Sequence, residues 1–132
     1  MKTVDVAVGV IKRGTHIFIS KRPDTLHQGG KWEFPGGKRE ANETMEQALA
    51  RELMEEIGIK VVSQIPLMCI EHDYGDKRVV LDVRVIEGFE GEPKGMEGQQ
   101  TCWVAMADLN QYDFPAANYA IIEQLQRHYC PD

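Results

Sequence analysis

The chain contains 132 residues, with 15 Lys or Arg against 21 Asp or Glu, which gives a formal net charge of −6 at pH 7. This length suits one domain, so we expect residues 1–132 to fold as a single unit. An acidic chain is not expected to bind nucleic acid over a broad surface, because such binding needs clustered Lys and Arg. No apolar run approaches the roughly 20 residues of a membrane-spanning helix, and the N-terminus does not resemble a signal segment. We therefore expect a cytoplasmic protein without membrane partners.

The cysteines argue against two further kinds of site. Cys69, Cys102 and Cys130 are an odd number, lie far apart in the sequence and include no C-x-x-C pair. This spacing supports neither a disulfide framework nor a zinc site, so we expect three reduced thiols.

Strands are predicted near the N-terminus. Valines at every second position over residues 4–10 predict a strand, and a turn around Gly14 leads to a partner strand at 17–20. A short segment at 32–34 predicts a third strand. We expect it to end in a loop at 35–37, because these residues are Pro-Gly-Gly.

A helix is predicted at about residues 45–57. Thr44 is followed three residues later by Gln47, which is the spacing of a capping box, and Gly58 stands where helices often end in a left-handed residue. At 100° per residue, the predicted buried stripe consists of Met45, Leu49, Ala50, Leu53 and Ile57.

A hairpin is predicted in the second half of the chain. Its strands are segments 61–74 and 79–89, which flank the turn residues Gly75 and Asp76. Pro66 indicates a bulge or an irregular start, because proline has no N–H for the strand ladder.

The remaining elements complete the predicted fold class. Residues 90–100 contain three glycines and a proline and predict a loop, 101–106 predict a short strand, and the helical spacing over 115–129 predicts a C-terminal helix. Strands and helices mix without regular βαβ alternation. The predicted class is therefore α+β, a mixed sheet with helices packed on it.

The most unusual feature is a concentration of glutamates, six of them between positions 40 and 56 with Arg51 as the one basic residue. On the predicted helix, Glu52 and Glu56 lie within about 20° of Met45, and Glu55 lies about 80° away. They overlap the edge of the buried stripe, where an i,i+4 pair of like charges costs stability unless a cation joins it. Carboxylates without His or Cys favour Mg²⁺ or Mn²⁺. The alternative is a solvated glutamate-rich face that binds nothing.

The wider pattern favours the metal site. Gly37 is followed after five residues by Glu43, and after seven more by RELMEEIGI at positions 51–59. This resembles the signature of the Nudix hydrolases, G-x5-E-x7-R-E-U-x-E-E-x-G-U with U aliphatic, and it matches at every specified position. A chance match in a chain of this length is rarer than about one in a million.

The likeness extends beyond the signature. The segments AVGVI, KRPDTLHQGGKWEFPGGK, GEPKGMEGQ and DFPAAN are similar to the MutT branch of that family, the 8-oxo-dGTP diphosphatases. The resemblance implies an α/β/α sandwich on a mixed sheet, flanked by the glutamate helix and a C-terminal helix. It also implies hydrolysis of a nucleoside triphosphate to a monophosphate and pyrophosphate by water attack at the β-phosphorus. The biological role would be to remove oxidised guanine nucleotides before DNA replication uses them, which avoids mutations.

Site residues follow from the same resemblance. The metal, Mg²⁺ with Mn²⁺ as a substitute, would be held by the main-chain carbonyl of Gly37 and the side chains of Glu52, Glu55 and Glu56. Glu52 is the first candidate for the general base, and Glu97 is the second candidate for the base or for a further metal ligand. Arg51 is expected to fix a neighbouring carboxylate. Glu43 is expected to hydrogen-bond a residue that binds the metal, without binding the metal itself.

Substrate contacts are expected from five residues. Arg22 and Lys38 would contact phosphate. Asn118 would read the base, because a carboxamide can accept from the N7–H of an 8-oxo-purine and donate to its O6. Phe34 would line the base pocket or else belong to the core, and Lys77 or its neighbour in the hairpin turn would approach the purine.

Three rival functions remain open at this point. The substrate could be CTP, a methylated pyrimidine nucleotide or another (d)NTP. The domain could bind nucleotides without catalysis, although three crowded carboxylates argue against it. Isomerisation of a diphosphate also occurs on similar scaffolds. We expect a monomer whose partner is its nucleotide substrate.

Overall fold

The computed structural model describes residues 2–24 and 29–130. Its strands are β1 Lys2–Arg13, β2 His16–Lys21, β3 Trp32–Glu33, β4 Gly36–Lys38, β5 Lys60–Val61, β6 Ile65–Asp73, β7 Lys77–Ile86, β8 Phe89–Glu90 and β9 Thr101–Ala105. Its helices are α1 Met45–Ile57 and α2 Tyr119–Tyr129, with 3-10 helices at Met106–Gln111 and Ala116–Asn118.

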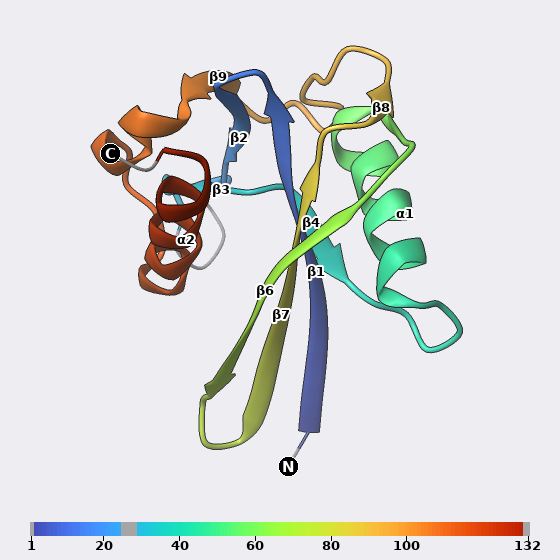
Figure 1. Ribbon diagram of the computed structural model, residues 1–132. Helices are drawn as coiled ribbons and strands as arrows, with labels where there is room; N and C mark the ends of the chain where they lie inside the picture. Colours follow the sequence, from blue (N-terminus) through green and yellow to red (C-terminus); the bar gives the residue numbers. More distant parts are fainter. Residues whose placement is uncertain (1, 25–28, 131–132) are drawn as a thin grey trace.

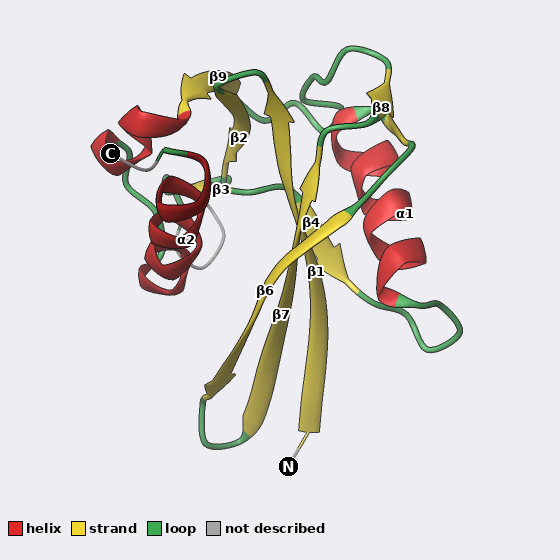
Figure 2. Ribbon diagram, in the orientation of Figure 1, coloured by secondary structure: helices red, strands yellow, loops and turns green. Residues whose placement is uncertain are grey.

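A mixed seven-stranded sheet separates α1 from α2 (Figures 1 and 2). The strand order is β3-β2-β1-β7-β6, with β4 added beside β1 and β9 beside β2. The β1 and β7 strands run parallel, whereas the other neighbours are antiparallel. This is the α/β/α arrangement predicted from the sequence, and the α+β class is confirmed.

The alternation along β1 divides the core into two layers. Ala7 and Ile11 pack with Leu49 and Leu53 of α1, whereas Val8 and Val10 face the other side, where Ile121, Ile122 and Leu125 of α2 are buried. Successive strand side chains point to opposite faces. One valine-rich strand therefore holds both helices in place.

The boundaries of α1 agree with the prediction. The Thr44 side chain and Gln47 form the full capping box, and Gly58 has the left-handed conformation at φ 70°. In the buried stripe, however, Ala48 and not Ala50 is fully buried. The packed face is therefore rotated towards Glu52 and Glu56 relative to the predicted stripe.

The loop predicted at 35–37 is wrong in part, because Gly36–Lys38 forms strand β4, paired with Val6–Val8 of β1. A Cβ atom on Gly36 would overlap the carbonyl oxygen of Ala7. The two glycines look like turn residues in the sequence. Here their missing side chains instead allow two backbones to approach closely.

The predicted hairpin is present as β6 and β7, with a register shift between Pro66 and Met68. Its outer ends are different from the prediction, because β5 and β8 form a separate two-stranded sheet. The C-terminal α-helix also starts later than predicted, at Tyr119 and not at 115. The preceding turn is 3-10, closed by the hydrogen bond from Asn118 N to Pro115 O at 2.9 Å.

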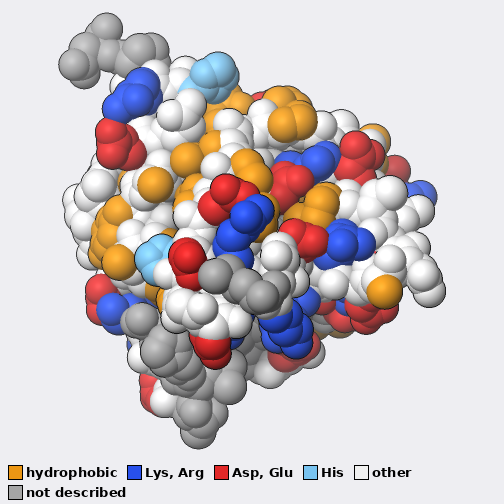
Figure 3. Space-filling model, turned by 90° about the horizontal axis from the view of Figure 1, so that it is seen from below, with side chains coloured by type: hydrophobic (Ala, Val, Ile, Leu, Met, Phe, Trp, Pro, Cys, Tyr) orange, Lys and Arg blue, Asp and Glu red, His pale blue; other side chains and the backbone are white. Residues whose placement is uncertain are grey.

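Surface features of the described residues are ordinary. All three cysteines are free thiols. No helix within the described ranges has the combination of length and apolar character that crossing a membrane requires. On the face in Figure 3, acidic and basic side chains are interspersed, and the described residues form no continuous basic patch there.

Candidate active site

Two glutamates of α1, Glu52 and Glu56, face strand β4. Because Leu49, Leu53 and Ile57 are packed against the sheet, the adjoining positions Glu52 and Glu56 are directed at the two glycines of β4. A Cβ atom on Gly37 would overlap the Glu52 carboxylate, and the Gly36 N–H donates to Glu56 Oε2 at 3.3 Å. The glycine pair therefore lets two carboxylates approach the backbone of β4.

Arg51 holds two carboxylates at once. It donates from Nε to Glu43 Oε2 at 3.0 Å, from Nη2 to Glu43 Oε1 at 2.6 Å and from Nη1 to Glu52 Oε1 at 2.8 Å. Nη2 also donates to the carbonyl oxygen of Lys38 at 3.0 Å, and Glu55 Oε1 lies 3.5 Å from Nη1. The planar guanidinium thus fixes Glu52 relative to Glu43 and β4.

The charge states of these groups differ sharply. Hydrogen bonds from Arg51, together with one from the backbone N–H of Glu40, lower the pKa of Glu43 to about 2. Burial raises the pKa of Glu56 to about 8, and the nearby negative charges of Glu52, Glu33 and Glu97 add to the rise. Only the Gly36 N–H opposes it. Glu56 is therefore a largely buried carboxyl group whose ionised form is disfavoured by the negative charges around it.

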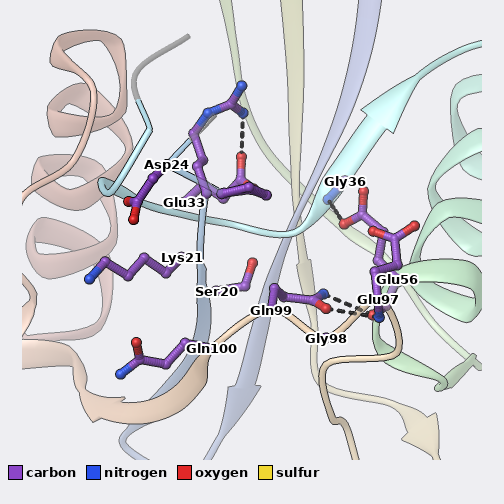
Figure 4. A pocket seen from close by; sticks show the side chains of 12 residues that line it. Ser20, Lys21, Asp24, Glu33, Gly36, Glu56, Glu97, Gly98, Gln99 and Gln100 are labelled. Atoms are coloured by element: carbon purple, nitrogen blue, oxygen red, sulfur yellow. Dashed lines mark hydrogen bonds and ion pairs between the residues drawn. The ribbon is translucent and has the colours of Figure 1, made fainter. Parts of the chain in front are cut away.

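A cavity of about 550 Å³ opens beside Glu56 (Figure 4). It lies between the end of β2, strands β3 and β4, the last turns of α1, and the loop at residues 97–100. Its lining residues are Ser20, Lys21, Arg22, Pro23, Asp24, Glu33, Gly36, Glu56, Glu97, Gly98, Gln99 and Gln100.

Besides Glu56, two predicted charged residues line this cavity, Arg22 and Glu97. Arg22 follows β2 and donates from Nη1 to Glu33 Oε1 at 2.8 Å, and burial raises the pKa of Glu33 despite this contact. Glu97 reaches in from the opposite loop, and its side chain lies next to that of Glu56 in Figure 4. A cationic and an acidic group thus face the same space.

Four predicted substrate residues do not line this cavity as the described residues form it. Phe34 is only 4% exposed and stacks on Phe114, with ring centroids 5.2 Å apart. Lys38 is exposed at the end of β4. Lys77 lies at the start of β7, with Nζ 5.9 Å from the centroid of the Tyr74 ring. Asn118 is half-buried before α2 and makes no side-chain capping bond.

Sequence reasoning missed several polar residues of the cavity, among them Glu33 and Gln99. Glu33 had a usable signal, because it alternates with two aromatic residues in the predicted strand at 32–34 and so points away from them. Gln99 had none. Its placement depends on contacts with α1, 43 positions earlier in the sequence.

The predicted metal ligands are not gathered into a finished cluster. Among the described residues, no group of three or more His, Cys, Asp or Glu is arranged to hold a metal ion. Glu52 and Glu55 contact Arg51, whereas Glu56 contacts Gly36. The donor chemistry nevertheless fits a hard divalent cation, because Mg²⁺ needs only one or two carboxylates together with waters and substrate phosphates. The unbalanced negative charge around Glu56 is what such a cation would neutralise.

Comparisons with known proteins find relatives along nearly the whole chain. The NUDIX domain model matches residues 6–124. The 8-oxo-dGTP diphosphatase of Escherichia coli K12 is 42% identical over 128 residues, covering 96% of this chain and 99% of that protein. The CTP pyrophosphohydrolase of the same organism is 31% identical over 123 residues, covering 93% and 91%.

A solved structure gives the same result. A MutT structure, from a study of Aliivibrio salmonicida and Vibrio cholerae, superimposes with a TM-score of 0.88 at 42% identity, and covers 97% of this chain and 100% of that one. The fold, the complete signature at residues 37–59 and the family match lead to one conclusion. The chain belongs to the Nudix domain family.

Proposed function

We propose that this protein is a Mg²⁺-dependent hydrolase that converts 8-oxo-dGTP to 8-oxo-dGMP and pyrophosphate. The observation that carries the proposal is the 42% identity, over nearly the whole of both chains, to an E. coli protein with that activity in its name. The cavity supports it independently, because Glu56, Glu97 and Arg22 meet there.

The residues that would hold the metal are the Gly37 carbonyl and the side chains of Glu52, Glu55, Glu56 and Glu97. Mg²⁺ or Mn²⁺ held by these residues would neutralise phosphate charge and would lower the pKa of a bound water. A triphosphate carries about four negative charges into a chain whose own net charge is −6, so unaided electrostatics oppose binding.

Glu52 is our choice for the group that accepts the proton of the attacking water. Arg51 holds the Glu52 carboxylate in place through the 2.8 Å hydrogen bond from Nη1. Glu97 is the second candidate for this role. Arg22 would exchange part of its contact with Glu33 for a phosphate oxygen, and the exposed Lys38 would add positive charge at the end of β4.

Base selection is assigned to Asn118. Oxidation at C8 turns N7 of guanine into a donor, and a carboxamide accepts from it while donating to O6. The side chain of Asn118 makes no capping bond to α2, so a cap does not account for it. The segment before it is attached to β3 by the hydrogen bond from Trp32 N to Asp113 O at 2.8 Å, and Phe34 stacks on Phe114. Phe34 thus supports this segment from the core, while Lys77 stays a proposed contact at the hairpin.

One specific observation favours a second candidate. The CTP pyrophosphohydrolase relative shares 31% identity over most of both chains, so the same chemistry on CTP is the alternative. The two candidates differ in the base that the protein must recognise. A purine-reading carboxamide at position 118 has no reason to favour cytosine.

The test is a turnover comparison of 8-oxo-dGTP, dGTP and CTP with and without Mg²⁺, in which monophosphate and pyrophosphate are quantified. We expect 8-oxo-dGTP to be strongly preferred, and Glu52→Gln to lower turnover by orders of magnitude in a protein that still folds. Preference for CTP would select the alternative. Binding without pyrophosphate release would leave only a nucleotide-binding module.

Two further proposals concern the setting. A nucleotide-pool substrate is consistent with a cytoplasmic location and a role in avoiding mutations during DNA replication. We also propose that the protein is a monomer. Size-exclusion chromatography with light scattering tests the second point directly.

A further inference from the structure

The loop that carries Glu97 is attached to the C-terminal end of α1. The last carbonyls of a helix have no partner within the helix, and here the loop supplies partners. Lys94 N donates to the carbonyl oxygen of Ile57 at 3.0 Å, and Met96 N donates to that of Glu56 at 3.0 Å. The Gln99 side chain adds a third bond, from Nε2 to the same Glu56 oxygen at 3.0 Å.

Gln99 also binds the loop itself. Its Oε1 accepts from the backbone N–H of Glu97 at 2.9 Å. One carboxamide therefore joins the backbone of Glu97 to the backbone of Glu56, and Figure 4 shows both bonds beside the cavity. The carboxylates of these two residues line that cavity.

Besides the two backbone bonds from Lys94 and Met96 to α1, few contacts among the described residues fix the loop in this conformation. Gly95 and Gly98 flank Glu97 and contribute no side chains, and the bond from Gly98 N to Gly95 O is long, at 3.3 Å. Met96 is 51% exposed, so apolar burial contributes little. Glycines also raise the conformational entropy that ordering the loop must overcome. A side chain bonded at both ends counters this cost.

We propose that Gln99 is a positioning residue, which fixes where Glu97 enters the cavity relative to Glu56. It lies outside the signature at residues 37–59 and carries no charge to offer the substrate. The inference rests on the proposed function, because the placement of Glu97 matters for turnover only if Glu97 acts on the metal or the water.

The test variant is Gln99→Met. The methionine side chain is similar in length to that of glutamine but makes neither of the two hydrogen bonds. The chain offers a matched control in Gln64→Met. Gln64 Nε2 donates to the Glu46 carbonyl at 2.9 Å, and its Oε1 accepts from Arg84 at 3.5 Å. Gln64 therefore ties a neighbouring segment to the other end of α1, away from the cavity.

Three measurements are made on both variants: steady-state kcat and KM with Mg²⁺, the thermal midpoint, and amide hydrogen exchange without metal. We expect Gln99→Met to lower kcat by about tenfold to a hundredfold, with a smaller change in KM, and to speed exchange at the Glu97 amide. Gln64→Met should keep wild-type kcat and wild-type exchange in the loop, although its thermal midpoint falls by a similar amount.

A double variant separates positioning from general damage. If Gln99 acts through Glu97, adding Gln99→Met to Glu97→Gln should change kcat by less than about twofold. The inference would be overturned if the kcat losses of the two single variants multiply in the double variant. It would also be overturned if Gln99→Met keeps wild-type kcat and exchange, or if Gln64→Met loses as much kcat as Gln99→Met. A wild-type protein without Mg²⁺-dependent turnover would instead refute the proposed function, and this inference with it.

Discussion

The proposed role of Glu56 as a metal ligand predicts that protons and metal compete for its side chain. With a pKa of about 8, about one Glu56 carboxyl in eleven is ionised at pH 7, and about ten in eleven are ionised at pH 9. Only the ionised form is a metal ligand. The apparent affinity for Mg²⁺ should therefore rise about tenfold from pH 7 to pH 9, or about 1.4 kcal/mol.

The same pKa predicts how stability depends on pH when no metal is present. The ordinary value for a glutamate is 4.5, so the folded protein binds the additional proton between about pH 4.5 and pH 8. The free energy of unfolding should fall as pH rises through this window. The reason is that unfolding releases the proton of Glu56, and a higher pH favours that release. The difference sets a ceiling of about 5 kcal/mol. Solvent at the mouth of the cavity should reduce the effect to about 1–3 kcal/mol.

The perturbation that isolates this effect is Glu56→Gln. In EDTA at pH 9 we expect this variant to unfold at a higher denaturant concentration than the wild type, and the two should converge near pH 5. Isothermal titration with Mg²⁺ at pH 7, 8 and 9 measures how the affinity of the wild type changes with pH. The variant should lack this pH dependence. Equal pH dependence of stability in both proteins would refute the assignment of the proton to Glu56.

Three other predictions concern catalysis and base selection. Arg51→Lys should lower kcat by about tenfold or more, since one ammonium cannot replace the paired bonds to Glu43 and the bond to Glu52; wild-type kcat in this variant would mean that Arg51 is only a surface contact. Gly37→Ala should also lower kcat by at least about tenfold, because the added methyl group displaces the Glu52 carboxylate, and an unchanged rate with intact folding would contradict that placement. Asn118→Ala should reduce the ratio of kcat/KM for 8-oxo-dGTP over dGTP by about two orders of magnitude or more, and a ratio that stays constant would remove Asn118 from base recognition.

Local sequence patterns were sufficient for the elements with local causes. Helix α1 follows from its capping box, its left-handed Gly58 and its apolar spacing, each of which acts within a few residues. The β6–β7 hairpin and its irregularity at Pro66 follow in the same way, from turn residues and the missing N–H of proline.

Elements that depend on distant partners were predicted less well. Strand β4 was predicted as a loop, because only its pairing with β1 makes two glycines extended. The sequence left two roles open for Phe34, in the base pocket or in the core. Its stacking on Phe114, which lies 80 positions later in the sequence, places it in the core.

By itself, the sequence determined the family, the α/β/α architecture and the set of carboxylates on α1, since a spacing of three or four residues on a helix fixes a common face. Only the tertiary structure decided which partner each carboxylate contacts. It turns Glu52 towards Arg51, leaves Glu56 beside Glu97 with a raised pKa, and ties the Glu97 loop to α1 through Gln99. The physical reason is that burial, and contacts between segments far apart in the chain, depend on how the whole sheet and its helices pack, which no local spacing records.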